Sequence, residues 1–246
     1  MTTIKLKIFI TLLLFSIINT SLAKEKVDTY LVYAKLPLLG EVEVQNIETK
    51  LTISEKKFKY SYKVNPTKLI DFFDDKISSG YILGEFQNGS ISTNTYLFKT
   101  EKDDFIRTIK FTYTENIIDD VSILPSYDLS KITNVSRKMI DESIDPVTMF
   151  YMITNFKFIK NCDKVISVYD GKRRYDLILS DPIKSKNSYS CTLTHQKIAG
   201  YKPKKIDEDI KYVSDLKFLI NSNNLYEFNE VSLRNNNTDL IIRKSN

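Results

Sequence analysis

The chain has 246 residues, of which 42% are hydrophobic, 12% aromatic and 27% charged, and its formal net charge is +5. Six glycines and six prolines are too few for a collagen-like or low-complexity chain, and the apolar content is too high for a disordered one. A chain of this length can bury a sizeable core as one globular domain. The single histidine, His195, excludes a site that needs two imidazoles.

Residues 1–23 have the layout of a secretory signal. Lys5 and Lys7 precede an apolar run at 8–18, and Ser21 and Ala23 supply the small residues of a cleavage site. The run is shorter than the roughly 20 residues that span a bilayer, which disfavours the alternative of a membrane anchor. We therefore expect cleavage after Ala23, a periplasmic location, and one β-rich domain over residues 24–246 without a membrane span.

Removal of the signal takes two lysines with it and so lowers the positive net charge of the chain. The basic residues that remain are spread along the chain, whereas nucleic-acid-binding domains usually concentrate them on one face. The composition therefore predicts no nucleic-acid partner.

Alternation of apolar and polar residues predicts the strands. It runs through 31–36, 41–47, 57–64, 105–114 and 212–220, and it places the apolar side chains of each segment on one face. Turn signals separate such segments at Leu39-Gly40, Asn88-Gly89 and Asp170-Gly171, and the last two pairs suit two-residue hairpins. Strands joined by short turns favour an antiparallel meander.

Two helices are predicted between the strands. Asn65-Pro66 and Asp145-Pro146 each supply an N-cap and a first-turn proline before an apolar segment. The second segment, 147–156, is apolar on nearly every side, which predicts burial against the sheet. Residues 116–144 are predicted to form a turn-rich connection.

The predicted fold class is mainly β with minor α. We expect a single curved, mostly antiparallel sheet, or a partly open barrel, packed on one or two helices. A two-sheet sandwich is the alternative. The sheet must curl because a short helix cannot cover so many apolar positions on one face.

Cys162 and Cys191 are the only cysteines, and the predicted export takes them to an oxidising compartment. An even number of cysteines there favours a structural disulfide between them. No C-x-x-C motif is present for redox exchange, and one histidine cannot complete a four-ligand zinc site. We predict neither a metal site nor a cofactor.

The segment 168–177 carries the candidate ligand-binding residues Arg173, Arg174 and Tyr175. If Gly171 closes a hairpin, Arg173 shares a face with Tyr175, while Arg174 lies on the opposite face. An arginine that faces inward needs a carboxylate partner or an anionic ligand, because an unpaired buried charge is costly. The alternative is a solvated hairpin tip with local ion pairs.

This same segment carries a family resemblance. The run 169–176, preceded by Asp145-Pro146 with its apolar helix and flanked by Cys162, Cys191 and 199–201, resembles a proteobacterial exported family. That family is known as domain of unknown function 3108, and the resemblance covers about residues 140–202. It implies a periplasmic, β-rich protein with no assigned activity, and it brings no catalytic residues.

Three functional hypotheses follow. The first is a non-enzymatic envelope protein that binds a hydrophobic or anionic amphipathic ligand inside the curved sheet. The second is a structural protein that docks an envelope partner through edge strands or loop 116–144. The third is a hydrolase that uses Asp170, Arg173 or His195, and it is disfavoured because no nucleophile motif is present.

For the first hypothesis, the predicted inner face offers a broad aromatic surface. The predicted helix from Val147 either fills this concavity or leaves room for an acyl chain, and the arginines would then attract the head group. The residues predicted to form this face are Phe58, Tyr60, Tyr62, Phe105, Ile109, Phe111 and Tyr113.

Overall fold

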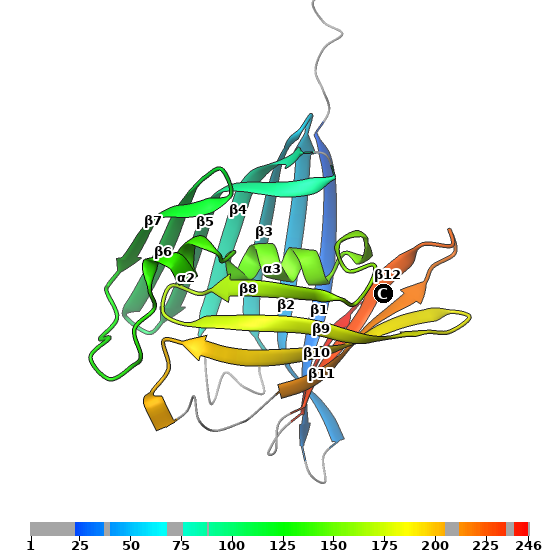
Figure 1. Ribbon diagram of the computed structural model, residues 1–246. Coiled ribbons are helices and arrows are strands. Elements are labelled where there is room, and N and C mark those ends of the chain that lie inside the picture. The colour runs from blue at the N-terminus through cyan, green and yellow to red at the C-terminus, as the bar shows by residue number, and fades with distance from the viewer. Residues whose placement is uncertain are drawn as a thin grey trace, which may run out of the picture.

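The computed structural model describes residues 23–36, 40–67, 76–87, 89–204, 212–234 and 239–245. Thirteen strands form one antiparallel sheet that does not close into a barrel (Figure 1). The strands are β1 (Lys24–Leu36), β2 (Gly40–Ser54), β3 (Lys57–Pro66), β4 (Ile77–Gln87), β5 (Ser90–Lys102), β6 (Phe105–Thr114), β7 (Ile117–Leu124), β8 (Lys164–Tyr169), β9 (Arg174–Lys184), β10 (Ser188–Ala199), β11 (Tyr212–Ile220), β12 (Tyr226–Arg234) and β13 (Asp239–Lys244). The helical elements are α2 (Arg137–Asp141), α3 (Pro146–Ile153) and the short 3₁₀ turn η1 (Phe156–Phe158).

The sheet consists of two meanders joined at the chain's first and last strands. Strands β1 to β7 pair in sequence order, and so do β8 to β13. The two series meet where β1 pairs with β13, for example Tyr30 with Lys244. Strands β7 and β8 are therefore the two edges of the sheet.

The sheet folds over on itself around α3. In Figure 1, β8 to β11 cross in front of β1 to β7, and α3 lies between the two parts. The ring of Tyr151 lies 4.8 Å from that of Tyr60 in β3, while Ile153 belongs to the core cluster formed with β8 to β12. Phe150 packs against the core clusters of both parts. Because apolar residues of α3 face both parts of the sheet, their burial stabilises this arrangement.

The connection between the two meanders covers both edge strands. Ile144 pairs with Val168 of β8 as a parallel bridge, with backbone hydrogen bonds of 2.9 Å to Ser167 and Tyr169. At the other edge, the Arg137 guanidinium donates to the carbonyl oxygens of Ile118 and Asp119 in β7. Polar backbone groups that an edge strand leaves unpaired are satisfied in this way.

Glycine is required where the turn between β8 and β9 meets its neighbours. Gly200 has a φ of +81°, and a Cβ atom there would lie 2.0 Å from the carbonyl oxygen of Lys172. Gly171 has a φ of +93°, and its Cβ position lies 3.1 Å from Ile109 of β6. These two positions let the turn pack directly against both parts of the sheet.

The structure confirms the main sequence predictions about the fold. The sheet is single, antiparallel and unclosed, and it packs on two helices. Helix α3 begins at the predicted place, with Asp145 as its N-cap and Pro146 in its first turn. A two-residue hairpin joins β4 to β5, since Gln87 pairs with Ser90.

Three local predictions were wrong. Asn65 and Pro66 do not begin a helix but end β3, where they pair with Asn46 and Gln45, and the rest of that predicted helix falls mainly on residues 68–75, outside the described ones. The turn at Asp170 has four residues, because Tyr169 pairs with Arg174. The predicted connection 116–144 contains the strand β7 and the helix α2.

The predicted signal segment lies outside the described residues, apart from Ala23. Within the described ranges, none of the helices has the length and apolar character needed to cross a bilayer.

Candidate ligand-binding cavity

A buried carboxylate positions the helix that divides the interior. Asp145 accepts hydrogen bonds from the backbone N–H groups of Val147 and Thr148, at 2.9 and 2.8 Å, and from the Thr148 hydroxyl at 2.6 Å. Its other contact is the Tyr113 hydroxyl of β6, which donates at 2.8 Å. Burial raises the pKa of the Asp145 carboxyl, and these hydrogen bonds act in the opposite direction. The start of α3 is thereby tied to the β1–β7 part of the sheet.

Helix α3 fills most of the concavity on the side of β1 to β7. Phe58, Tyr60, Ile109 and Phe111 are buried there against Val147 and Tyr151 of the helix. Of the other residues predicted to face inward, Tyr62 and Tyr113 are partly buried in this cluster, whereas Phe105 is 46% exposed at the end of β6. The helix was predicted either to fill the concavity or to leave room for an acyl chain, and on this side it fills most of the concavity.

A cavity of about 600 Å³ lies on the other side of α3. Side chains from α3, β9, β10, β12 and β13 make its wall predominantly apolar. The apolar and aromatic lining residues are Met149, Phe150, Ile153, Tyr175, Leu177, Leu193, Tyr201, Val231, Leu233, Leu240 and Ile242. Small-molecule sites have this form, with roughly 300–1,000 Å³ of mostly apolar surface and a few polar groups.

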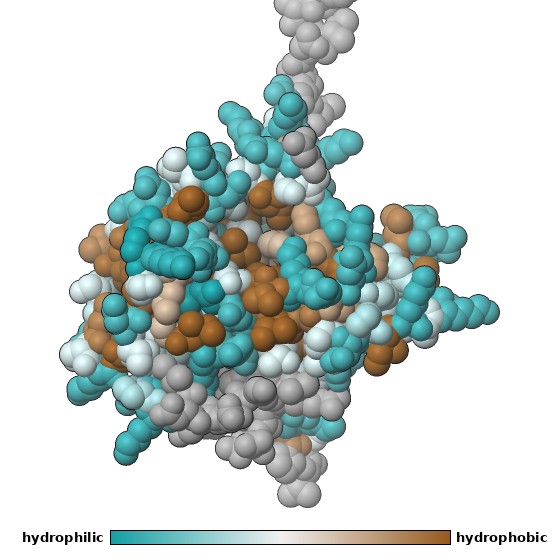
Figure 2. Space-filling model, viewed as in Figure 1, coloured by the Kyte–Doolittle hydropathy of each residue, from teal (hydrophilic) through white to brown (hydrophobic). Residues whose placement is uncertain are grey.

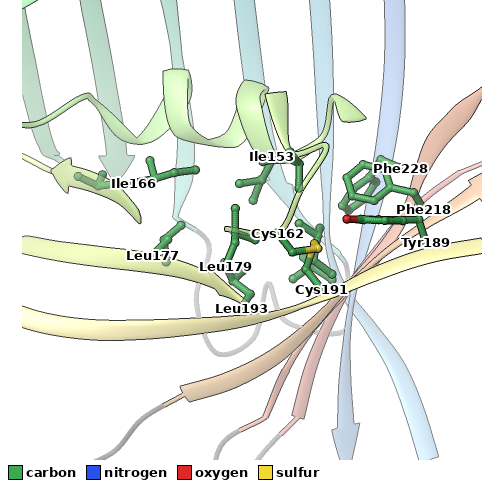
Figure 3. Close-up of a cluster of buried hydrophobic side chains, with 14 of the residues drawn as sticks. Ile153, Cys162, Ile166, Leu177, Leu179, Tyr189, Cys191, Leu193, Phe218 and Phe228 are labelled. Carbon is green, nitrogen blue, oxygen red and sulfur yellow. A yellow bond between two sulfur atoms is a disulfide. The ribbon is translucent and has the colours of Figure 1, made fainter. Parts of the chain in front are cut away.

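The cavity adjoins the core cluster that contains the disulfide (Figure 3). Cys162, which follows η1, is bonded to Cys191 of β10, and their Cα atoms lie 5.6 Å apart. Ile153, Leu177 and Leu193 belong to this cluster and also line the cavity. The predicted disulfide is confirmed, and it holds the segment after α3 against the sheet that forms the cavity wall.

Polar residues gather at one end of the cavity. Arg173, Lys197, Tyr201 and Asp170 all line it, and Arg173 and Lys197 lie over the Tyr201 ring at 5.6 and 5.9 Å from its centroid. One oxygen of Asp170 accepts from the backbone N–H groups of Lys172 and Arg173, at 2.8 and 2.6 Å. That carboxylate therefore stabilises the turn, while the two cationic side chains reach the cavity.

Two further polar side chains lie deeper in the cavity. The His195 ring packs on Tyr175 with its centroid 4.8 Å away. Ser214 of β11 is 1% exposed, and its hydroxyl makes no hydrogen bond within the described part of the chain. A buried hydroxyl without a partner favours a ligand that brings one, because leaving it unpaired costs about 1–3 kcal/mol.

The environment of His195 leads to a prediction about pH. Burial lowers the pKa of His195 from 6.5, and the nearby charges of Lys197 and Arg173 lower it further. The unfolded chain therefore binds more protons than the folded protein as the pH falls through about 6.5, so stability is lost in that range. We expect His195→Gln to flatten the decrease in melting temperature between about pH 7 and pH 5.

Thermal unfolding followed by circular dichroism at several pH values measures this effect. A variant whose melting temperature falls in parallel with that of the wild type would contradict the prediction.

The three candidate residues of the hairpin have different places. Arg173 and Tyr175 line the cavity. Arg174 does not: it is 6% exposed, pairs with the Asp176 carboxylate at 2.7 Å and donates to the backbone oxygen of Tyr175 at 2.8 Å. The Asp176 carboxylate thus neutralises the charge of Arg174, while the Arg174 Nε makes no hydrogen bond within the described part of the chain.

Sequence reasoning missed the contribution of the C-terminal strands. Ser214, Leu233, Leu240 and Ile242 line the cavity but were not predicted as site residues. A signal for one of them was present, because Ser214 continues the alternation of Leu216 and Phe218 in β11. A small polar residue in that register marks a place where the inner face is not filled.

Among the described residues that line the cavity, His195 and Ser214 are the side chains that nucleophilic catalysis would use. The Ser214 hydroxyl makes no hydrogen bond to a described base. The described residues also contain no group of three or more His, Cys, Asp or Glu side chains that would hold a metal ion.

A scan of the chain against protein-family models found no match, and searches of curated proteins and of solved structures found none either. The resemblance to domain of unknown function 3108 stays a prediction.

Proposed function

We propose that this is an exported periplasmic protein that binds an anionic amphiphile in the cavity between α3 and β9 to β13, without catalysing a reaction. The observation that carries this proposal is the apolar cavity of about 600 Å³ with Arg173 and Lys197 at one end. An acyl chain placed along the apolar wall brings an anionic head group to these two cations. The ligand's tail and head thus match the two chemically distinct parts of the cavity.

The volume sets the size of the ligand. A methylene group takes up roughly the same volume as a water molecule in the liquid, about 30 Å³, so the cavity holds about 20 non-hydrogen atoms. This suits one acyl chain with a small head group and is too little for two long chains. At about 0.3 kcal/mol per atom, the expected dissociation constant is in the tens of micromolar.

The proposal is tested by titrating the mature protein with a fluorescent long-chain fatty acid. We expect saturable binding by the wild type and binding that is about 10-fold weaker in Arg173→Ala, because a charge-assisted hydrogen bond contributes about 1.5–3 kcal/mol. Leu233→Trp, which replaces an isobutyl group of the cavity wall with a bulky indole ring, should prevent binding by occupying the space.

Arg243→Ala is the matched control, since Arg243 pairs with Glu41 and Glu230 and does not line the cavity. No saturable binding by the wild type, or equal affinities of the Arg173 and Arg243 variants, would contradict the proposal.

The second candidate is an interaction protein that docks an envelope partner through its edge strands or loop 116–144. The structure favours it less, because Ile144 covers part of β8 and Arg137 covers part of β7. It becomes the better hypothesis if no amphiphile binds.

A further inference from the structure

Cationic and aromatic side chains alternate along one continuous strip of the surface. The Arg107 guanidinium of β6 lies 4.9 Å from the ring centroid of Phe105 and 4.0 Å from that of Tyr127. The Lys172 ammonium lies 5.0 Å from the centroid of the same Tyr127 ring. Arg173 follows Lys172 in the chain. It continues the strip to Tyr201 and, across that ring, to Lys197.

The strip runs from the beginning of β6 to the polar end of the cavity. Arg173, Tyr201 and Lys197 are both strip residues and cavity-lining residues. A hydrogen bond of 3.1 Å from the Arg107 Nε to the carbonyl oxygen of Pro125 and backbone bonds between Thr133 and the 200–201 segment hold these elements together.

Exposed apolar side chains lie at the rim of the sheet, beside the strip. Ile106, Leu124 and Leu129 are 49%, 68% and 56% exposed. Ile106 and Leu124, which pairs with Thr108, point to the opposite face of the sheet from Arg107, at the rim where β6 begins and β7 ends. Leu129 lies two residues beyond Tyr127. In Figure 2, hydrophobic side chains reach the surface over the left edge of the molecule, where Figure 1 places β6 and β7.

Among the described residues around the strip, basic side chains outnumber acidic ones. The exposed side chains of Lys131, Lys202 and Lys204 add to its own four cations. The acidic residues nearest in the chain are Asp103, Asp104, Asp128 and Asp170, together with Asp176, which pairs with Arg174, and Asp207, Glu208 and Asp209, which follow Lys204. Lysines and arginines beside tyrosines and exposed leucines are the residues that anchor proteins at an anionic membrane surface.

We propose that this strip docks the protein on an anionic lipid bilayer, with the polar end of the cavity facing the membrane. This goes beyond the proposed function, because it assigns a second surface and a second partner. The basic side chains contact the lipid phosphates, and Ile106, Leu124 and Leu129 enter the head-group region. Single-stranded nucleic acid is a poorer fit, because cations already occupy positions over the Tyr127 and Tyr201 rings on which bases would stack.

The test is flotation of the mature protein with lipid vesicles. We expect binding when a third of the phosphatidylcholine is replaced by phosphatidylglycerol, little binding to phosphatidylcholine alone, and release by high salt. The triple variant Lys172→Gln, Lys202→Gln, Lys204→Gln removes three cations outside the cavity lining, and we expect about 100-fold weaker binding. The pair Ile106→Gln and Leu129→Gln should also weaken it, while leaving the charge unchanged.

A matched triple variant, Lys56→Gln, Lys57→Gln, Lys186→Gln, removes the same charge from exposed positions in two other turns and should bind vesicles like the wild type. The proposal would be overturned if the wild type bound neutral and anionic vesicles equally, or if both triple variants lost the same amount of vesicle binding. It would also be overturned if the protein bound single-stranded DNA and did not bind vesicles. Fatty-acid binding by the Lys172 triple variant is measured in parallel. It stays unchanged if only docking is lost, so failure of either proposal is recognised separately.

Discussion

Replacing Cys191 with Ser should lower the free energy of unfolding by about 3.5 kcal/mol. The bond between Cys162 and Cys191 spans a sequence separation of 29, and in the loop-entropy model closing such a loop restricts the unfolded chain by this amount. Both cysteines are 2% exposed within the core cluster beside the cavity. The loss should therefore affect the whole domain.

Guanidinium unfolding of the wild type, with and without a reductant, and of the Cys162→Ala, Cys191→Ala double variant measures the effect. Reduction of the wild type and the double substitution should shift the midpoint similarly, and reductant should not change the double variant. Labelling of two thiols in unreduced, denatured protein would contradict the bond itself.

Replacing Asp145 with Ala should lower the free energy of unfolding by about 3 kcal/mol or more. The substitution removes the N-cap of α3, worth about 0.5–2 kcal/mol, and leaves the buried donors of Val147, Thr148 and Tyr113 without their acceptor. Each buried donor that loses its partner adds about 1–3 kcal/mol unless it finds another.

Two matched variants separate these contributions. Asp145→Asn keeps one side-chain oxygen and should cost less than Ala, and Tyr113→Phe removes a single hydroxyl and should cost least. Denaturant unfolding of the three variants gives the order. A loss below about 1 kcal/mol for Asp145→Ala would show that the network does not hold the helix.

The elements that could be predicted from sequence are those whose signal is local. Alternation at 57–64 and 105–114 requires only that one face of a strand be apolar, and the Asp145-Pro146 start of α3 requires only a cap and a proline. The same local signal failed at Asn65-Pro66. There the chain stays paired with β2 up to Pro66, and this pairing outweighs the preference of two residues.

The sequence by itself determined the mainly β class, the place of α3 and the pairing of the two cysteines. Only the tertiary structure decided where the cavity lies. Helix α3 is apolar on nearly every side, so its pattern does not tell which residues face which part of the sheet. In the folded protein Tyr151 fills the space against β3, whereas Met149, Phe150 and Ile153 leave room toward β9 to β13. The space left between side chains depends on residues that are distant in sequence and pack together in the fold. It therefore cannot be predicted from residues that are neighbours in the sequence.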